Sequence, residues 1–451
     1  MSSLHFRKDL LPILRNRIPG QLVVQVTDRC NARCPQCGMR VTERYRRSSL
    51  SMEKTRAIID SAAARGIRAI SFTGGEPLLL FSDLVEMIEY AAGAGIDYIR
   101  TGTNGYLFCD SDAAGFDTRV HRIAERLSRT SLRNFWISID SAVPAVHENM
   151  RGFPGVIKGI SKAVPIFHEH GIYPSANLGI NRLVGGPGIP VATDSQLAAE
   201  PTWQRSLLTY KNAFRRFYRF VSNLGFSIVN ACYPMSIAAD RSEGGLEVVY
   251  GANSQEQIVR FSRLEKGLLF KALQETIIEY RERIRIFSPL SSLYALHRQH
   301  SSGDGQPLYP CRGGIDFFFI DARDANTYPC GYRGSENLGK YWQLKKVSGA
   351  VAATCTRCDW ECFRDPSELF GPLLAAFSQP GQLLRDCIRD WNRYRLWLSD
   401  IRYYKACDYF DGRRPLDSRR LSKFKRCSDP YVPSPRQWTD CIDGMVPRDG
   451  A

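Results

Sequence analysis

Apolar and polar positions in the first half of the chain alternate between two periods. Short runs rich in β-branched and aromatic residues, such as QLVVQVT at 21–27, are typical of buried strands. Between them, apolar residues recur every three or four positions, as in amphipathic helices. We therefore expect strands at 21–27, 68–73, 97–102, 134–140, 173–180 and 226–229, and helices at 51–65, 83–94, 118–128, 154–170 and 214–223.

This alternation of strands and helices predicts parallel βα units with right-handed crossovers. In such folds the chemistry lies at the carboxyl ends of the strands. Four chemically rich segments follow or close predicted strands, at 30–37, 74–76, 103–104 and 138–140. We expect these four segments to meet at one end of the α/β unit.

The second half has a different pattern. Residues 183–195 are rich in Gly and Pro and predict an irregular loop. Residues 257–280 predict one long amphipathic helix, and 236–253 and 299–309 predict mobile loops. A hairpin is expected from IDFFFI and NTYPC, joined by a turn at 322–325. From residue 370 the chain is expected to be helical.

Length and composition narrow the class of protein. The chain has 451 residues, enough for two or three domains. No apolar run approaches the roughly 18–20 residues of a membrane span, and the N-terminal segment lacks the pattern of a secretory signal. We therefore expect a cytoplasmic protein, in which clustered cysteines favour metal or redox chemistry over disulfides.

Charge and cysteine usage point to different features. The net charge of +15 favours anionic partners, although a merely solvated basic surface is an equally simple reading. Eight of the 14 cysteines fall into two groups. The other six have no ligand spacing among themselves, and no metal is assigned to them.

The first cysteine group is TDRCNARCPQC, directly after the strand at 21–27. Its spacing lets the thiolates of Cys30, Cys34 and Cys37 converge on one centre. Three thiolates are one short of a closed structural zinc site, whereas an iron–sulfur cluster with three protein ligands keeps one iron open. A zinc loop completed from elsewhere stays an alternative at this point.

A second motif lies about forty residues downstream. In RAISFTGGEP, a strand ends at Gly74 and Gly75, and Glu76 supplies a carboxylate. Glycines at this position allow close approach of the backbone to a ligand. With the cysteine motif, this sequence resembles the radical S-adenosylmethionine superfamily. The resemblance covers about 22–180 and implies a partial (β/α)6 barrel.

The resemblance also implies cofactors and roles. Cys30, Cys34 and Cys37 would hold a [4Fe–4S] cluster whose open iron is chelated by S-adenosylmethionine, and the Gly74–Glu76 segment would contact the methionyl amine. ISIDS and HENMRG resemble segments of peptide-modifying and sulfatase-maturing members, which implies that Ser138 and Arg151 contact the cofactor. The alternative is that Ser138 is a strand-end hydroxyl and Arg151 a surface charge. Asn104 is a further candidate, although TNG is also an ordinary turn.

The second cysteine group consists of Cys311, Cys330, Cys355, Cys358 and Cys362. A hairpin plus a CxxC pair brings four thiolates together, which a zinc ribbon would also do. The arrangement resembles the SPASM or twitch extension, which carries auxiliary [4Fe–4S] clusters. Ala325 stands where that pattern has glycine, and the spacing after CxxC departs from it. We therefore expect one auxiliary cluster, and leave open whether Cys358 or Cys362 is the spare.

Together these observations divide the chain into five parts. They are an N-terminal basic segment (1–20), the barrel (21–235), loops with the long helix (236–308), a cysteine-rich hairpin domain (309–369) and a basic helical C-terminal region (370–451). In the last part, thirteen Lys and Arg against six Asp and Glu lie between residues 381 and 427, interleaved with aromatics. An anionic lipid surface is a candidate partner for it. No RNA-binding module is visible, so nucleic acid is not expected.

We expect an enzyme that reductively cleaves S-adenosylmethionine to a 5′-deoxyadenosyl radical and abstracts hydrogen from a peptide or natural-product precursor. An external one-electron reductant of flavodoxin or ferredoxin type is implied. A lipid or other small metabolite is the alternative substrate. A non-catalytic iron–sulfur module is the alternative from another class, although it would not need Glu76.

One further residue is a catalytic candidate. Cys232 lies just past the strand expected at 226–229, and therefore at the predicted mouth of the barrel. A thiol has a weak S–H bond, and in some radical S-adenosylmethionine epimerases a cysteine returns a hydrogen atom to the substrate. Cys232 is predicted to be a hydrogen donor or a substrate contact. The alternative is a small buried hydrophobe.

Overall fold

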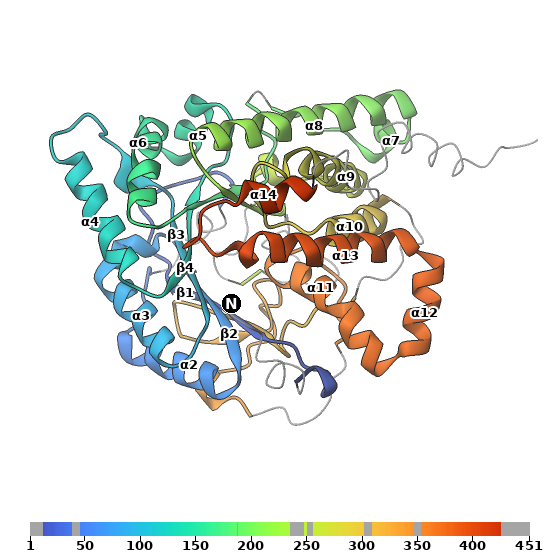
Figure 1. The fold of residues 1–451 in the computed structure, drawn as a ribbon, viewed down its shortest axis with the longest axis horizontal. Coiled ribbons are helices and arrows are strands. Elements are labelled where there is room, and N and C mark those ends of the chain that lie inside the picture. The colour runs from blue at the N-terminus through green and yellow to red at the C-terminus, as the bar shows by residue number, and fades with distance from the viewer. Residues whose placement is uncertain are drawn as a thin grey trace, which may run out of the picture.

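The computed structural model describes residues 12–37, 46–186, 188–234, 248–249, 256–301, 309–345 and 353–424. In its first half, strands and helices alternate as the sequence predicts, and the helices lie outside the strands (Figure 1). The strands are β1 (Gly20–Thr27), β2 (Ile67–Gly74), β3 (Tyr98–Thr103), β4 (Leu132–Ser138), β5 (Ser175–Gly179) and β6 (Ile228–Cys232). The helices are α2 (Met52–Ala64), α3 (Phe81–Gly93), α4 (Phe116–Ser128), α5 (Pro144–Arg151), α6 (Val156–Glu169), α7 (Asp194–Leu197) and α8 (Glu200–Asn223).

All of these strands are parallel to their neighbours. The described residues form one nine-stranded sheet in the order β7-β6-β5-β4-β3-β2-β1-β8-β9. Consecutive parallel strands that lie side by side, each joined by a helix on the outside, give a partial βα barrel. The predicted α/β fold with a partial βα barrel is confirmed.

Local signals explain where helices start and why they pack. The hydroxyl of Ser51 accepts a hydrogen bond from the backbone N–H of Lys54 and caps α2. Apolar residues of α2 and α3, including Ile58, Ile59, Leu84 and Ile88, are fully buried against the sheet. Burying one such side chain contributes about 1.5–3 kcal/mol. The outer helices thus hold the strand ends in fixed places.

The middle of the chain differs from the expectation of one long amphipathic helix over 257–280. Residues Gln257–Val259 form a short 3₁₀ turn, and α9 (Arg263–Tyr280) begins only after Ser262, which forms a capping box with Glu265. α9 is buried on most of its surface, Lys271 and Gln274 included, because α8 and α10 (Leu290–Ser301) pack against it. The predicted mobile loops at 236–253 and 299–309 lie largely outside the described residues.

The parallel pattern also extends one strand further than the sequence predicts. β7 (Arg285–Ile286) follows α9 and pairs in parallel with β6. Its two residues are too few to give a periodic signal, which explains why it is not predicted.

The cysteine-rich hairpin joins the same sheet. β8 (Phe317–Ile320) and β9 (Thr327–Tyr328) pair antiparallel, and β8 also pairs in parallel with β1 over Gln21–Val24. Residues 21 and 317, nearly 300 positions apart in the chain, are therefore neighbours. The hairpin extends the barrel at its β1 edge and lies next to the loop that follows β1.

The C-terminal region is helical in its described part. α11 (Glu361–Ser378), α12 (Pro380–Arg389), α13 (Trp391–Ala406) and α14 (Ser418–Leu421) follow the hairpin, and α12 lies at the edge of the molecule (Figure 1). Several of its arginines are paired within the protein: Arg393 with Glu368, and Arg420 with Asp408. No helix in the described ranges is long and apolar enough to cross a membrane.

Candidate functional site

The four segments singled out in the sequence lie around one cavity. This cavity, which we name the loop cavity, has a volume of about 620 Å³ and is bordered by the loop after β1. Every residue predicted to bind the first cluster or its cofactor lines it: Cys30, Cys34, Cys37, Gly74, Gly75, Glu76, Asn104, Ser138 and Arg151.

Close backbone packing positions the cysteine loop. The N–H of Gly75 donates to the carbonyl of Thr27 at 2.8 Å, and the N–H of Glu76 donates to the carbonyl of Arg29 at 2.8 Å. A Cβ at Gly74 would stand 1.9 Å from the Thr27 oxygen, and one at Gly75 would stand 2.1 Å from the Arg29 oxygen. The two glycines therefore let the end of β2 contact the start of the cysteine loop. From the sequence, these glycines were expected to allow a ligand, rather than the loop, to approach the backbone.

The three cysteines of the loop face a common space. The N–H of Ala32 lies 3.4 Å from the sulfur of Cys30, and Cys37 N–H donates to the carbonyl of Cys34 at 3.1 Å. Burial raises the pKa of Cys30 and Cys34, while the guanidinium of Arg151 acts against this rise at both thiols. These thiols are therefore neutral in the free protein, and metal binding would release their protons.

Glu76 is fully buried between two elements. One carboxylate oxygen accepts from the N–H of Leu78 at 3.0 Å and caps a 3₁₀ turn, and the other accepts from the N–H of Asn104 at 2.6 Å. Burial raises the pKa of this carboxyl to about 7, although both backbone hydrogen bonds act to lower it. Glu76 thus ties β2 to β3 and still borders the loop cavity.

Asn104 connects the strand ends to the cysteine loop. Its amide nitrogen donates to Asn31 at 2.9 Å and lies 3.7 Å from the sulfur of Cys30. Its side-chain oxygen accepts from the N–H of Tyr106 at 3.0 Å, as expected of a turn. Asn104 is therefore a turn residue that also borders the loop cavity, and its contact with the cofactor stays a prediction.

A carboxylate that the sequence analysis did not assign a role lies at the centre of the cavity wall. Asp140 accepts from Gln36 at 2.7 Å and from the Nε of Arg151 at 2.6 Å, both through the same oxygen. Burial of Arg151 disfavours its charged form. The negative charges of Asp140 and Cys34 outweigh this effect and raise the pKa of Arg151 above its usual range. Burial lowers the pKa of the neighbouring His147 to about 4, which leaves its ring neutral. Arg151 therefore carries a fixed positive charge beside the cysteines.

The donor set and two orphaned atoms test whether cofactors fit here. The second oxygen of Asp140 and the side-chain oxygen of Gln36 are buried and have no hydrogen-bond partner among the residues that the structure describes. Buried polar atoms are rarely left unpaired, so these two acceptors suit a ligand that brings donors. Three thiols from one loop suit an iron–sulfur cluster with one open iron. The loop cavity therefore fits a [4Fe–4S] cluster with S-adenosylmethionine.

A second, smaller cavity of about 300 Å³ adjoins the first. We name it the hairpin chamber because Phe319 of β8 and Tyr332, Trp360, Glu361 and Cys362 from the segments beyond β9 line one side of it. Residues that border both cavities are Gln36, Thr73, Gly74, Trp136, Asn177 and Gly179. The chamber thus lies between the strand ends and the hairpin.

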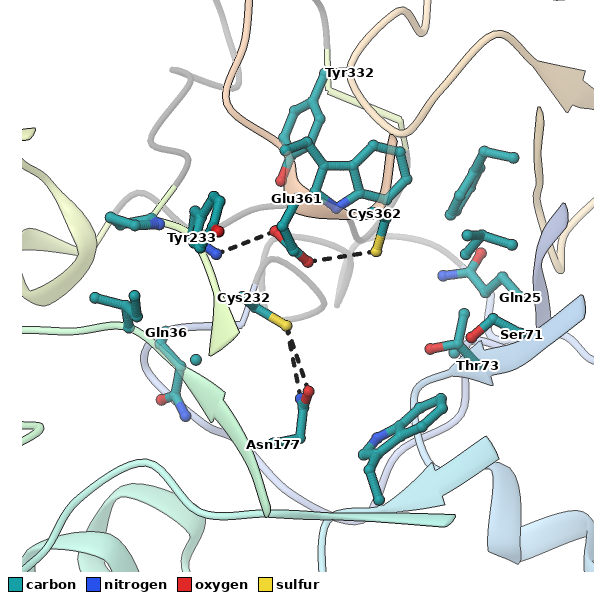
Figure 2. Close-up of a pocket in the computed structure, with 18 of the residues that line it drawn as sticks. Gln25, Gln36, Ser71, Thr73, Asn177, Cys232, Tyr233, Tyr332, Glu361 and Cys362 are labelled. Atoms are coloured by element: carbon teal, nitrogen blue, oxygen red, sulfur yellow. Dashed lines mark hydrogen bonds between the residues drawn. The ribbon is translucent and has the colours of Figure 1, made fainter. Parts of the chain in front are cut away.

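Cys232, the last residue of β6, lines the hairpin chamber. Its sulfur lies 3.7 Å from the amide group of Asn177 (Figure 2). Glu361 accepts from the N–H of Tyr233 at 3.1 Å and from the thiol of Cys362 at 3.4 Å. Burial raises the pKa of Cys232, Cys362 and Glu361 above their usual values.

The second cysteine group separates into four and one. Cys311 and Cys355 face each other in an antiparallel bridge, with Cys311 N–H donating to the Cys355 carbonyl at 2.7 Å. Burial raises the pKa of Cys330 to about 12, with a further contribution from the neighbouring Cys311 and Cys355, and Cys358 has Cys330 and Cys311 as its electrostatic neighbours. Cys362 has instead Glu361 and Cys232 beside it, in the hairpin chamber.

The departure from the SPASM pattern at Ala325 has a visible consequence. Ala325 is buried and has a φ of 57°, in the left-handed region that glycine adopts more readily. The turn of the hairpin therefore keeps the backbone shape that a glycine would give.

Among the described residues, no three His, Cys, Asp or Glu side chains are grouped closely enough to hold a single metal ion.

Sequence reasoning missed Gln36, Arg100, Asn177 and Glu361, which border the two cavities. Gln36 lies inside the cysteine motif, and Arg100 and Asn177 lie within strands, so alternation of side chains along each strand was the available signal. Glu361 follows the CxxC pair without a recognisable spacing. Its place depends on contacts between β6 and α11 that only the fold reveals.

Comparison with known proteins finds similarity chiefly in the first half of the chain. Residues 24–196 match the model of the Radical SAM superfamily. The AdoMet-dependent heme synthase of Oleidesulfovibrio alaskensis is 24% identical over 322 residues, which cover 68% of this chain and 68% of the synthase. The GTP 3′,8-cyclase of Desulforamulus reducens is 33% identical over 159 residues, 34% of this chain and 44% of the cyclase. The chain thus spans less than half of the cyclase.

Among solved structures, Streptococcus suis SuiB bound to S-adenosylmethionine aligns with a TM-score of 0.44 and 14% identity, over 72% of this chain and 64% of SuiB. The enzyme anSMEcpe with bound AdoMet and a peptide aligns with the same TM-score and identity, over 72% and 78% of the two chains.

Proposed function

This chain belongs to the radical SAM superfamily, and we propose that it abstracts hydrogen from a peptide or natural-product precursor held in the hairpin chamber. As a radical SAM enzyme it uses a [4Fe–4S] cluster and S-adenosylmethionine. When bound, these groups supply a 5′-deoxyadenosyl radical, which takes a hydrogen atom from an unactivated carbon. The observation that carries the proposal is that the hairpin chamber adjoins the loop cavity through shared residues.

The chain's own residues position and shield these groups. Cys30, Cys34 and Cys37 would hold the first cluster. Arg151, paired with Asp140, keeps positive charge beside the thiolates and offsets part of the negative charge of a thiolate-ligated cluster. Glu76 and Asn104 would hold the methionyl group of the cofactor, and Ser138 borders the same cavity.

The second cysteine group supports one auxiliary cluster. Cys311, Cys330, Cys355 and Cys358 form a set of four neighbours, which is the number that closes a [4Fe–4S] site. Four thiolates would also suit zinc, although the described cysteines are not grouped closely enough here to hold a single ion. The metal content of the purified protein decides between a cluster and zinc. An auxiliary cluster beside the hairpin chamber suits electron transfer to or from a group in that chamber.

The proposal is tested by replacing Cys30, Cys34 and Cys37 with Ala in anaerobically reconstituted protein. With dithionite and S-adenosylmethionine, the wild-type protein should form 5′-deoxyadenosine and the variant none. Residual iron in the variant should stay near roughly four atoms per chain, because the second site is intact. Retained cleavage would overturn the assignment, and residual iron near zero would favour zinc or no metal at the second site.

For Cys232 we propose hydrogen return to the substrate radical. Its S–H bond would break and a C–H bond form, and the sulfur radical would regain one electron from the external reductant and one proton from solvent. In D₂O the thiol carries deuterium, so the product should gain one deuterium in the wild type and none in Cys232→Ala. Cys109→Ala, a half-buried thiol outside both cavities, is the matched control. If the Cys232 variant incorporated as much deuterium as the wild type, Cys232 would be a buried packing residue and not a hydrogen donor.

A second candidate substrate is a tetrapyrrole. The similarity to the AdoMet-dependent heme synthase extends over 322 residues, well beyond residues 24–196. Iron tetrapyrroles absorb visible light strongly, so a titration of the reconstituted protein would detect binding. Consumption of an added tetrapyrrole in step with 5′-deoxyadenosine would favour this candidate over a peptide.

A further inference from the structure

The hairpin chamber has an uneven distribution of charge. Of the described residues that line it, only Arg100 and Glu361 carry groups that are charged at neutral pH in water. The remaining polar groups are amides, hydroxyls and thiols. The charge of the substrate that the chamber accepts therefore depends on whether Arg100 or Glu361 is free to contact a bound molecule.

The guanidinium of Arg100 is held in place without an acidic partner. Its Nε donates to the hydroxyl of Ser71 at 3.1 Å. Its central carbon lies 5.3 Å from the ring of Trp136 and 5.9 Å from the ring of Phe287. Across the part of the chain that the structure describes, neither terminal nitrogen of Arg100 contacts a carboxylate.

Glu361 does not supply this missing partner. Its two oxygens are engaged by the N–H of Tyr233 and by the thiol of Cys362. Figure 2 shows Glu361 beside Tyr233 and Cys362, whereas Ser71, the partner of Arg100, lies on another wall with Gln25 and Thr73. Arg100 lines the chamber, and its positive charge acts on the thiols of Cys232 and Cys362 across it.

A charge that is partly withdrawn from water gains from an opposite charge beside it. A guanidinium presents a planar pair of donors that matches an oxyanion. We infer that Arg100 binds an anionic group of the substrate, a carboxylate or a phosphate, in the hairpin chamber. This inference rests on the proposed function, because it takes the chamber as the place of the substrate. The anionic end then lies at β3, and the rest of the substrate reaches the residues shared with the loop cavity.

The test uses three probes of similar size on the reconstituted protein with S-adenosylmethionine: benzoate, phenyl phosphate and the neutral benzamide. Isothermal titration should show benzoate or phenyl phosphate binding at least tenfold more tightly than benzamide, and the tighter of the two identifies the anion. Arg100→Met should abolish the preference over benzamide, and Arg100→Lys should restore part of it.

The matched control is Arg126→Met. Arg126 on α4 also stacks on an aromatic ring, 4.6 Å from Phe81, but borders neither cavity, so this variant should keep the wild-type preference. Equal iron content in all variants shows that they are folded and loaded. Benzamide binding as tightly as the anions, a preference that survives in Arg100→Met, or no binding of any probe would each overturn the inference. Formation of 5′-deoxyadenosine by the same wild-type preparation separates these outcomes from failure of the proposed function itself.

Discussion

Glu76 serves both the fold and the proposed cofactor site. Its carboxylate accepts two backbone hydrogen bonds and borders the loop cavity. A charge-assisted hydrogen bond to an ammonium group contributes about 1.5–3 kcal/mol, or roughly tenfold to a hundredfold in affinity. Glu76→Gln should weaken S-adenosylmethionine binding by this factor while the absorbance of the cluster persists. An unchanged dissociation constant would leave Glu76 as a turn residue only.

The same prediction extends to pH. The pKa of about 7 means that Glu76 is mostly protonated in the free protein below pH 7. An ammonium group favours the ionised form, so binding should strengthen by about fivefold between pH 6 and pH 7, below the pH at which an amino group loses its own proton. Titrations at the two pH values should show this dependence in the wild type and lose it in Glu76→Gln. A dependence of equal size in both proteins would assign it to another group.

Cys362 and Cys358 are predicted to have different roles, although the sequence places both beside the CxxC motif. Cys358 neighbours Cys330 and Cys311, whereas Cys362 is hydrogen-bonded to Glu361 in the hairpin chamber. Cys358→Ser should therefore lower the iron of the second site and change its electron paramagnetic resonance spectrum. Cys362→Ser should keep both. Iron loss of equal size in the two variants would make Cys362 a ligand.

At the scale of elements, the strands and helices of the first half could be predicted because each is long enough to show its period. β1 to β6 and the helices α2, α3, α4 and α6 lie within a few residues of the predicted ranges. α8 begins well before residue 214, and the short helices α5 and α7 were not predicted. α9 could not be predicted in detail, because burial on most faces removes the amphipathic pattern. The pairing of β8 with β1 depends on contacts distant in sequence, which no local pattern encodes.

The candidate site was predictable to a similar degree. Residues at strand ends carry recognisable motifs, and the fold brings these ends together around the loop cavity. Asp140 and Arg100 contribute through side-chain networks across neighbouring strands, such as the contact between Arg100 and Ser71. Single-sequence reasoning has no signal for such pairs until the strand order is known.

The contact between the end of β2 and the cysteine loop should be sensitive to one methyl group. In Gly75→Ala the new Cβ would lie 2.1 Å from the carbonyl oxygen of Arg29, so the loop must shift. Overpacking of this kind costs about 1–3 kcal/mol, and the displaced loop should lose the first cluster. Iron content and thermal unfolding measure both effects.

Gly93→Ala is the control for this change. Gly93 ends α3, and a Cβ there would meet nothing within 4 Å. Alanine is the better helix former, so this variant should be neutral or more stable by up to about 1 kcal/mol. If Gly75→Ala kept all its iron and unfolded at the wild-type temperature, the loop would not depend on close packing with β2.

At the scale of the whole molecule, the C-terminal helices are fastened to the barrel through buried polar groups. Asp400 of α13 accepts from Arg281 at the end of α9 at 2.6 Å and from the N–H of Leu290 at 3.0 Å. Its other oxygen accepts from the N–H and the hydroxyl of Ser291, both at 2.8 Å. One carboxylate therefore joins α9, α10 and α13, and thereby connects the end of the chain to the strand β7 between α9 and α10.

Removing one member of this buried pair should be costly. Asp400→Leu would leave the Arg281 guanidinium as a buried charge stacked 4.1 Å from the ring of Tyr403, without its counterion. Such a loss costs about 3–5 kcal/mol, whereas replacing both charged partners by apolar residues is far less damaging. The urea midpoint should therefore fall strongly in Asp400→Leu and in Arg281→Met. The double variant should lose less than the two single losses combined.

The exposed pair of Arg56 and Glu86 provides the comparison, since both side chains are about half exposed. Glu86→Ala should change stability by less than about 1 kcal/mol.

Additive losses in the double variant of Asp400 and Arg281 would mean that Asp400 acts through the N–H groups of α10 and independently of Arg281. A coupling above about 1 kcal/mol would instead establish the ion pair as the contact that fixes α13 to the barrel. The auxiliary hairpin and α11 lie between these elements in the chain, so a weakened α13 should also lower the iron retained at the second site.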